Sequence, residues 1–278
     1  MSLRHHLPDV TLCCVDTRHP DQAWWAIQRC TASFAFGQSL FFCPEGWSPP
    51  ASETADEVSL VPTPALRSIN DYNRFMLRDL RQHVRTSHVL VMQWDGFVIA
   101  PNRWEAGFLE WDYIGAPWYH GNSTGTVGNG GFSLRSRKLL DALAAMNHTD
   151  QEPEDMAICV TLRPELESRF GIRFAPLDVA QRFACEYGPY RAAFGFHGMH
   201  NFAHLLSAND LRAWLDVAPP EILQSKPARK LAKTLMQNGR TSEAIDLLNR
   251  RIYQKGVNVD DLILLLRALP RLVRDSVK

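Results

Sequence analysis

A single acid follows a strongly apolar stretch in "VLVMQWDGFVIAP", residues 89–101. The stretch is typical of a buried strand, and a charged Asp95 at its end costs free energy unless another group pairs with it. A hard divalent cation prefers carboxylate oxygens, and one that also binds a diphosphate needs only one or two of them from the protein. Asp95 is therefore a candidate metal ligand, with a turn-capping role as the alternative.

Two adjacent glycines occur in "VGNGGFSLRS", residues 127–136. Adjacent glycines let a ligand approach the backbone closely and leave N–H groups available to bind it. The alternative is a tight turn before a strand. The Gly-Lys-Ser/Thr ending of a Walker loop is absent, so the stretch does not predict that kind of phosphate site.

An acidic helix start and a pair of histidines complete the candidate chemistry. Glu154 and Asp155 in "EPEDMAIC" begin a predicted helix, whose N-terminus favours ionised carboxylates. An ionised carboxylate facing a cleft is a usable general base, and compensation of the helix dipole is the alternative. His197 and His200 in "FHGMHNF" can bind a divalent metal or can be structural.

Strand and helix patterns must position these residues. The expected strands are 9–17, 38–45, 56–64 and 87–95, and the expected helices between them are 21–34 and 68–84. This order favours an open, mostly parallel sheet with helices on its faces. Ligands of such sheets bind beyond the carboxyl ends of the strands, where Asp16 and Asp95 are expected.

The second half of the chain has a different residue pattern. Residues 96–136 predict short strands and long loops, and residues 172–186 predict a strand and an irregular segment. Helices are expected at 137–146 and 153–170, and four more helical segments follow residue 208. We therefore expect two domains, residues 1–207 and a helical appendage of residues 208–278. Its hairpin at 231–252 resembles a tetratricopeptide unit, although such arrays usually need three or more repeats.

The composition excludes several classes of protein. Lys and Arg total 30, as do Asp and Glu, so no net charge favours nucleic acid. The six cysteines form no CxxC pair and predict buried free thiols in a reducing compartment. No apolar run is long enough for a transmembrane helix, and the start of the chain lacks a signal-peptide core. A cytoplasmic location is expected, including attachment at the inner face of the membrane.

Four blocks of the sequence resemble the motifs of a large family of glycosyltransferase-like proteins described as a domain of unknown function. The blocks are Gln93–Asp95 (Q-x-D), Trp111–Trp118 (W-D-Y-I-G-A-P-W), Val127–Ser136 (V-G-N-G-G-F-S-L-R-S) and Glu154–Cys159 (E-D-x-x-x-C). The resemblance covers residues 8–205 and leaves out the helical tail. It implies an α/β fold, with a GT-A-like, Rossmann-type mixed sheet flanked by helices in residues 1–207.

The resemblance also implies a metal site. Gln93, Trp94 and Asp95 are similar to the Asp-x-Asp motif that holds Mn²⁺ or Mg²⁺ against the diphosphate of a nucleotide-sugar, with Gln93 in place of the first acid. His197 is similar to the late metal or phosphate contact of the family, and His200 is its alternate.

Further roles follow from the same resemblance. Asp155 is similar to the general base of inverting members, with Glu154 in support. The residues implied in the nucleobase and ribose pocket are Val15, Asp16 and Thr17, and those implied in the wall around the donor sugar are Asn129, Gly130 and Gly131. Trp111, Asp112 and Trp118 either shape the acceptor side or belong to the core.

The function implied is transfer of a sugar from a nucleotide-diphosphate sugar, with UDP as the commoner nucleotide, to an acceptor hydroxyl in glycan or surface polysaccharide synthesis. The acceptor is a glycan, a lipid-linked glycan, a protein or a small molecule. Two alternatives stay open: a metal-dependent nucleotide-sugar hydrolase, and a non-catalytic scaffold that acts through the helical tail. The tail is also the expected surface for a homo-oligomer or a protein partner.

Overall fold

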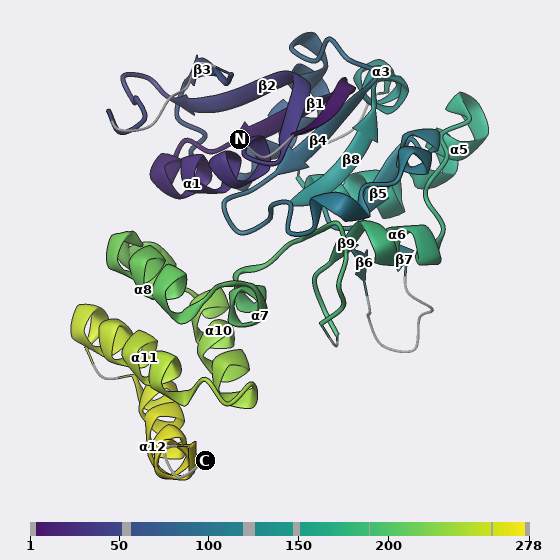
Figure 1. Cartoon of the computed structure of the whole chain (residues 1–278). Coiled ribbons are helices and arrows are strands. Elements are labelled where there is room, and N and C mark those ends of the chain that lie inside the picture. The colour runs from purple at the N-terminus through teal and green to yellow at the C-terminus, as the bar shows by residue number, and fades with distance from the viewer. Residues whose placement is uncertain are drawn as a thin grey trace. The chain divides into compact units, whose positions relative to one another are not determined.

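The computed structural model describes residues 4–51, 57–118, 126–146, 151–188, 190–256 and 258–275. The chain divides into two compact units, Met1–His197 and Gly198–Lys278. The first unit is a mixed α/β structure and the second consists of helices, as Figure 1 shows. Residues 198–207 belong to the second unit, and the domain boundary expected after residue 207 stays a prediction.

A six-stranded mixed sheet forms the centre of the first unit. Its strands lie in the order β3-β2-β1-β4-β8-β5. The strands β3, β2, β1 and β4 pair in parallel, whereas β8 runs antiparallel to both β4 and β5. The expected mixed sheet flanked by helices is confirmed. The bounds are β1 His5–Val15, β2 Phe34–Pro44, β3 Ser59–Thr63, β4 His88–Met92, β5 Tyr113–Gly115 and β8 Phe132–Ser136.

The central strands are buried on both faces. Every residue of β4 is buried, as are residues 10–15 of β1. Two-sided burial explains why both segments are nearly continuous apolar runs and not alternating patterns. All six cysteines are buried free thiols, which confirms that expectation.

The strand register places three segments at one edge of the sheet. β1 and β4 are parallel neighbours, with Cys14 opposite Met92, so residues 16–17 and 93–95 leave the sheet side by side. β8 runs the other way and begins opposite the end of β4, with Phe132 opposite Met92. The glycine turn before β8 therefore lies at the same edge as Asp95. The antiparallel direction of β8 is what brings it there.

The described part of this unit contains six α-helices. The bounds are α1 Pro20–Thr31, α2 Ile69–Arg74, α3 Arg137–Ala145, α4 Glu154–Met156, α5 Arg163–Phe170 and α6 Leu177–Phe183. The helix expected at 68–84 begins as predicted, since Ser68 and Asp71 form a capping box, and then widens into a π-helical turn at Phe75–Asp79. Leu80, from the 3₁₀ turn that follows, packs in the core against Val89 and Val91 of β4.

Two predictions for the region after α3 need correction. The single helix expected at 153–170 is interrupted by a π-helical turn at Ala157–Thr161, and α5 starts anew with Pro164 in its first turn. Residues 172–186 were expected to form a strand and an irregular segment. They contain the two-residue strand β9 (Ala184–Cys185), but α6 occupies much of the segment. Val179, Ala180 and Phe183 are buried at helical spacing, which explains the helix.

Two small sheets complete the unit. β6 Pro117–Trp118 pairs antiparallel with β7 Thr126–Val127, and β9 Ala184–Cys185 pairs in parallel with β10 Gly195–Phe196. β10 ends immediately before His197, so the second small sheet sets the position of this histidine.

The second unit is helical throughout the residues described. Its helices are α7 Phe202–Leu205, α8 Ala208–Val217, α9 Pro220–Leu223, α10 Lys226–Gln237, α11 Thr241–Lys255 and α12 Val259–Asp275, which confirms the helical tail. Arg251 is 2% exposed and pairs with Asp261 at 3.1 Å, linking α11 to the start of α12. No helix in the described ranges is long and apolar enough to cross a membrane.

Candidate functional site

Asp95 has a partner, and the partner is His197. A tight turn follows β4, in which the Gly96 N–H donates to the Gln93 carbonyl at 3.0 Å. Asp95 is only 8% exposed, and its Oδ1 lies 3.4 Å from Nε2 of His197. The imidazole thus offsets the cost of burying this carboxylate at the end of a strand.

His197 contacts four polar side chains. Its Nε2 lies 3.2 Å from Oε1 of Gln93, and its Nδ1 lies 3.1 Å from Oε1 of Glu186 and 2.9 Å from Nδ2 of Asn129. Burial by itself lowers the pKa of His197, but the carboxylates of Asp95 and Glu186 outweigh it and hold that pKa well above its usual range. The two carboxylates therefore favour the protonated form of the ring.

The glycine turn forms the floor of the site. A Cβ on Gly131 would lie 2.2 Å from Nε2 of His197, and one on Gly130 would lie 2.1 Å from Oε1 of Glu154. Neither glycine has a positive φ, so close packing of the two functional side chains, and not backbone conformation, requires them. Asn129 does have a positive φ, at 50°, a conformation that asparagine adopts more readily than most residues.

The same turn holds the acidic helix start. The Gly130 N–H donates to Oδ2 of Asp155 at 3.2 Å, and the Met156 N–H donates to Oδ1 at 2.9 Å. Asp155 is partly exposed, whereas Glu154 is 4% exposed. Of the two acids, Asp155 is the one that can meet a substrate.

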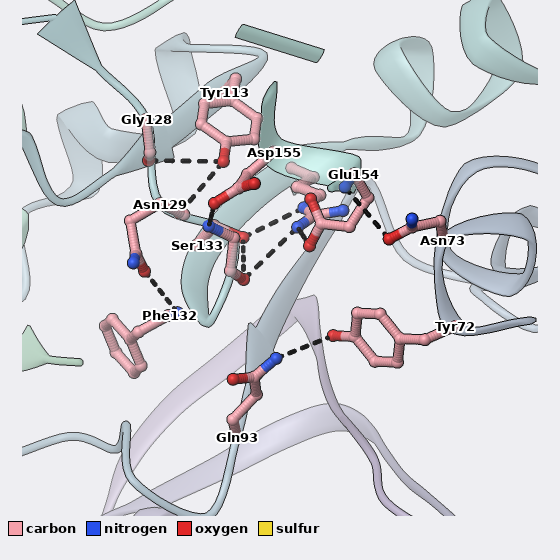
Figure 2. Close-up of polar contacts among 12 residues, drawn as sticks. Tyr72, Asn73, Gln93, Tyr113, Gly128, Asn129, Phe132, Ser133, Glu154 and Asp155 are labelled. Atoms are coloured by element: carbon pink, nitrogen blue, oxygen red, sulfur yellow. Dashed lines mark hydrogen bonds and ion pairs between the residues drawn. The ribbon is translucent and has the colours of Figure 1, made fainter. Parts of the chain in front are cut away.

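Glu154 belongs to a buried ion pair that the sequence did not point to. Its Oε1 lies 2.8 Å from Nη2 of Arg135, a fully buried residue whose Nε donates to Ser133 Oγ at 3.0 Å. Burial raises the pKa of Glu154, and Arg135 offsets part of that rise. Asn73 also holds Glu154 in place, because its Oδ1 accepts the Glu154 N–H at 3.2 Å, as Figure 2 shows. Arg135 lies inside the "VGNGGFSLRS" stretch, and this motif was the sequence signal that could have identified it as a site residue.

A cleft adjoins this cluster. It has a volume of about 350 Å³ and is lined by Val15, Asp16, Thr17, Arg18, His19, Leu66, Arg67, Ser68, Ile69, Tyr72, Gln93 and Trp94. The expected nucleotide residues at the ends of β1 and β4 therefore share one cavity. Gln93 links the cleft to the cluster, because its Nε2 donates to Tyr72 Oη at 3.2 Å while its Oε1 faces His197.

Two cleft side chains are engaged with the backbone. Asp16 Oδ1 accepts the N–H groups of Arg18 and His19 at 2.8 and 2.7 Å, just before α1. Thr17 Oγ1 accepts the Leu66 N–H at 3.0 Å and ties the far wall to β1. Both side chains shape the cleft wall through these bonds.

The remaining motif residues have structural contacts. Asp112 accepts hydrogen bonds from Ser136 Oγ at 2.6 Å and from the Arg173 N–H at 2.8 Å. The Trp118 ring packs on Gly128, where a Cβ would lie 2.3 Å from the ring. His200 belongs to the second compact unit and not to the unit that contains Asp95.

A divalent metal fits the donor set at Asp95. The described residues hold no group of three or more His, Cys, Asp or Glu side chains arranged around a metal position. A carboxylate oxygen and an imidazole nitrogen nevertheless face each other here. Two protein donors match a cation that takes its other ligands from a diphosphate and water.

Residues 56–197 match the model of a family described as "Protein of unknown function (DUF5672)". The chain belongs to this family. The matched range contains residues 93–95, 127–136 and 154–159. No curated protein matches the chain.

Solved structures similar to this chain share 11% sequence identity with it. One is a glycosyltransferase involved in the glycosylation of the major capsid of PBCV-1, with a TM-score of 0.44 over 82% of this chain and 98% of that one. Another is the mannosyltransferase PcManGT from Pyrobaculum calidifontis in complex with GDP-Man and Mn²⁺, with a TM-score of 0.39 over 99% and 76%. A third is S. aureus TarS 1–349 in complex with UDP-GlcNAc, with a TM-score of 0.38 over 96% and 81%.

Proposed function

We propose that this protein is a glycosyltransferase that moves a sugar from a nucleotide-diphosphate sugar, first of all a UDP-sugar, to an acceptor hydroxyl. The observation that carries the proposal is the convergence of Asp155, the Asn129–Gly131 turn and the Asp95–His197 pair at one sheet edge, beside a cleft. These groups supply the parts that such a transfer needs: a base, a floor for the sugar and a place for the diphosphate.

The nucleoside occupies the cleft between the ends of β1 and β4. Val15, Asp16, Thr17, Gln93 and Trp94 line this part of the cleft. Arg18 and Arg67 also line the cleft and add positive charge, which favours a ligand with phosphates. A nucleotide placed there directs its diphosphate toward Asp95.

Asp95 and His197 would hold Mn²⁺ or Mg²⁺ at the diphosphate. The metal, when bound, neutralises the charge that builds up on the leaving diphosphate. Gln93 contributes to this site by positioning the imidazole of His197, because its amide oxygen faces the same ring nitrogen as Asp95.

Asp155 acts as the general base. The two backbone N–H groups that bind its oxygens orient the carboxylate. It takes the proton of the acceptor hydroxyl as that oxygen attacks the anomeric carbon from the face opposite the diphosphate, which inverts the anomeric configuration. Glu154 is a positioning residue, since its carboxylate binds Arg135 beneath the turn.

Binding of UDP and GDP by calorimetry, with and without Mn²⁺, tests the donor site. We expect metal-dependent binding that Asp95→Ala removes, whereas Glu45→Gln, at an exposed acid outside the site, leaves it unchanged. Asp155→Asn should retain nucleotide binding and lose transfer. Normal transfer by that variant would refute the base assignment, and turnover of the donor without any acceptor would favour the hydrolase.

The scaffold alternative also has an observation in its favour. α12 exposes an apolar stripe formed by Val259, Leu262, Ile263, Leu266 and Leu269. A stripe of this kind is typical of a partner surface. It suits the proposed role of residues 208–278 in self-association or partner binding. A protein that binds no nucleotide, but changes oligomeric state on Leu266→Glu, would support the scaffold function over the transferase.

The setting is part of the same proposal. We place residues 1–207 as the catalytic domain, and we place the enzyme in the cytoplasm, including at the inner face of the membrane, in glycan or surface polysaccharide synthesis. The acceptor is a glycan, a lipid-linked glycan or a protein.

A further inference from the structure

Glu186 and His197 are brought together by the two-stranded β9–β10 sheet. Cys185 pairs with Phe196 in parallel register, so Glu186 and His197 follow the ends of neighbouring strands. The His197 N–H donates to the Cys185 carbonyl at 2.9 Å and extends this pairing by one residue. Glu186 is 7% exposed, and nothing in the sequence around it marks it as a site residue.

The imidazole of His197 lies between two carboxylates, one at each ring nitrogen. Nδ1 lies 3.1 Å from Glu186 Oε1, and Nε2 lies 3.4 Å from Asp95 Oδ1. Gly131 closes one face of the ring, because a Cβ there would lie within 2.7 Å of three ring atoms. Glu186 therefore cannot share the position between Nε2 and Asp95, since it lies at the opposite nitrogen.

Asn129 competes with Glu186 for Nδ1. Its Oδ1 accepts the Phe132 N–H at 3.3 Å (Figure 2), so its amide nitrogen is the atom that lies 2.9 Å from Nδ1. A bond donated by Asn129 requires a bare Nδ1 and puts the ring proton on Nε2, facing Asp95. A bond accepted by Glu186 requires a proton on Nδ1 and leaves the Nε2 lone pair facing Asp95.

We propose that Glu186 is a positioning residue that holds the proton on Nδ1 of His197, so that Nε2 is presented as a metal ligand beside Asp95. This inference rests on the proposed function, because it concerns the cation of the same site. Histidines that bind metals usually donate their other ring N–H to a carboxylate or carbonyl, and loss of that partner weakens metal affinity by about 10–100-fold. The geometry of Glu186 and His197 matches that arrangement.

The test is a calorimetric titration of the whole chain with Mn²⁺ in the presence of UDP, which measures the Mn²⁺ affinity. Glu186→Leu removes the acceptor and should weaken Mn²⁺ affinity by about 10–100-fold. Glu186→Gln keeps an acceptor oxygen without the charge, so its loss should be smaller. Thermal unfolding of each variant shows whether the fold is retained, and the conservative Gln variant keeps the test decisive if the Leu variant does not fold.

A double-mutant cycle separates positioning from a general structural role. In the background of His197→Ala, Glu186→Gln should cause no further loss of Mn²⁺ affinity, because its only route to the metal is the imidazole. An equal loss in both backgrounds would overturn the inference, as would wild-type affinity in the single Glu186 variants. Absence of Mn²⁺ binding by the wild-type protein would instead refute the metal role of the proposed function itself, and the inference with it.

Discussion

Gly131→Ala tests the packing of the glycine turn against His197. The added Cβ would lie 2.2 Å from Nε2, whereas non-bonded atoms settle at about 3.5–4.0 Å. The imidazole must therefore retreat by about 1.3–1.8 Å or the turn must move by a similar distance. Because φ at this glycine is not positive, alanine adds no backbone strain and the collision is the whole perturbation.

The expected cost has two parts. Overpacking of this kind destabilises a protein by about 1–3 kcal/mol, which lowers the unfolding temperature by about 2–4 °C per kcal/mol for a chain of this size. A ring displaced by about 1.3–1.8 Å also loses its alignment with Asp95 and Gln93, and we expect Mn²⁺-dependent UDP affinity to fall about 10–100-fold.

Calorimetry of UDP with Mn²⁺, together with thermal unfolding, measures both parts. Gly107→Ala is the matched control, since its Cβ would meet nothing closer than 3.9 Å and its φ is also not positive. We expect the control to bind and unfold like the wild type. Affinity within about twofold of wild type for Gly131→Ala, in a variant that unfolds at the same temperature, would refute the placement of His197 against the turn.

Three further predictions concern buried charges. Arg135→Met leaves the Glu154 carboxylate buried and unpaired and should lower the free energy of unfolding by about 3–5 kcal/mol in denaturant titrations, with part of the loss restored by adding Glu154→Leu. Because burial raises the pKa of Glu154, its contribution to stability is present below about pH 4.3 and is lost as pH rises through the raised pKa. The unfolding temperature of Glu154→Gln should therefore increase less than that of the wild type as the pH is lowered. Burial by itself would raise the pKa of Asp261, but Arg229 and Arg251 lower it by more, so the stability that Asp261 contributes is present above about pH 3.9 and is lost as pH falls. Asp261→Asn should abolish that acid-dependent loss and destabilise the protein at neutral pH. An unchanged unfolding profile would contradict the pairing.

Local patterns in the sequence predicted most elements of this fold. The β1 and β4 strands and the α1 and α3 helices lie close to the predicted ranges, because the strand and helix periods depend on neighbouring residues. The errors lie where two patterns compete, as in α6, whose seven residues are flanked by short extended segments. The candidate residues at strand ends also follow from this local reading.

The sequence did not show which distant groups meet. Asp95 and His197 are separated by about a hundred residues, and Glu186 has no motif around it, yet the β9–β10 pairing and the antiparallel β8 strand bring all three to the glycine turn. The same holds for Arg135, because a charged residue within a predicted strand gives no indication that it pairs with Glu154.

The sequence by itself therefore determined the α/β class, the helical tail, the free thiols and the four chemical motifs, since each depends on residue type and short spacing. The tertiary structure alone decided that Asp95 pairs with His197, that Glu154 is buried while Asp155 is partly exposed, and that each glycine of the turn makes room for one functional side chain. The physical reason is that burial and long-range contacts arise from strand order and direction, which local residue patterns do not specify.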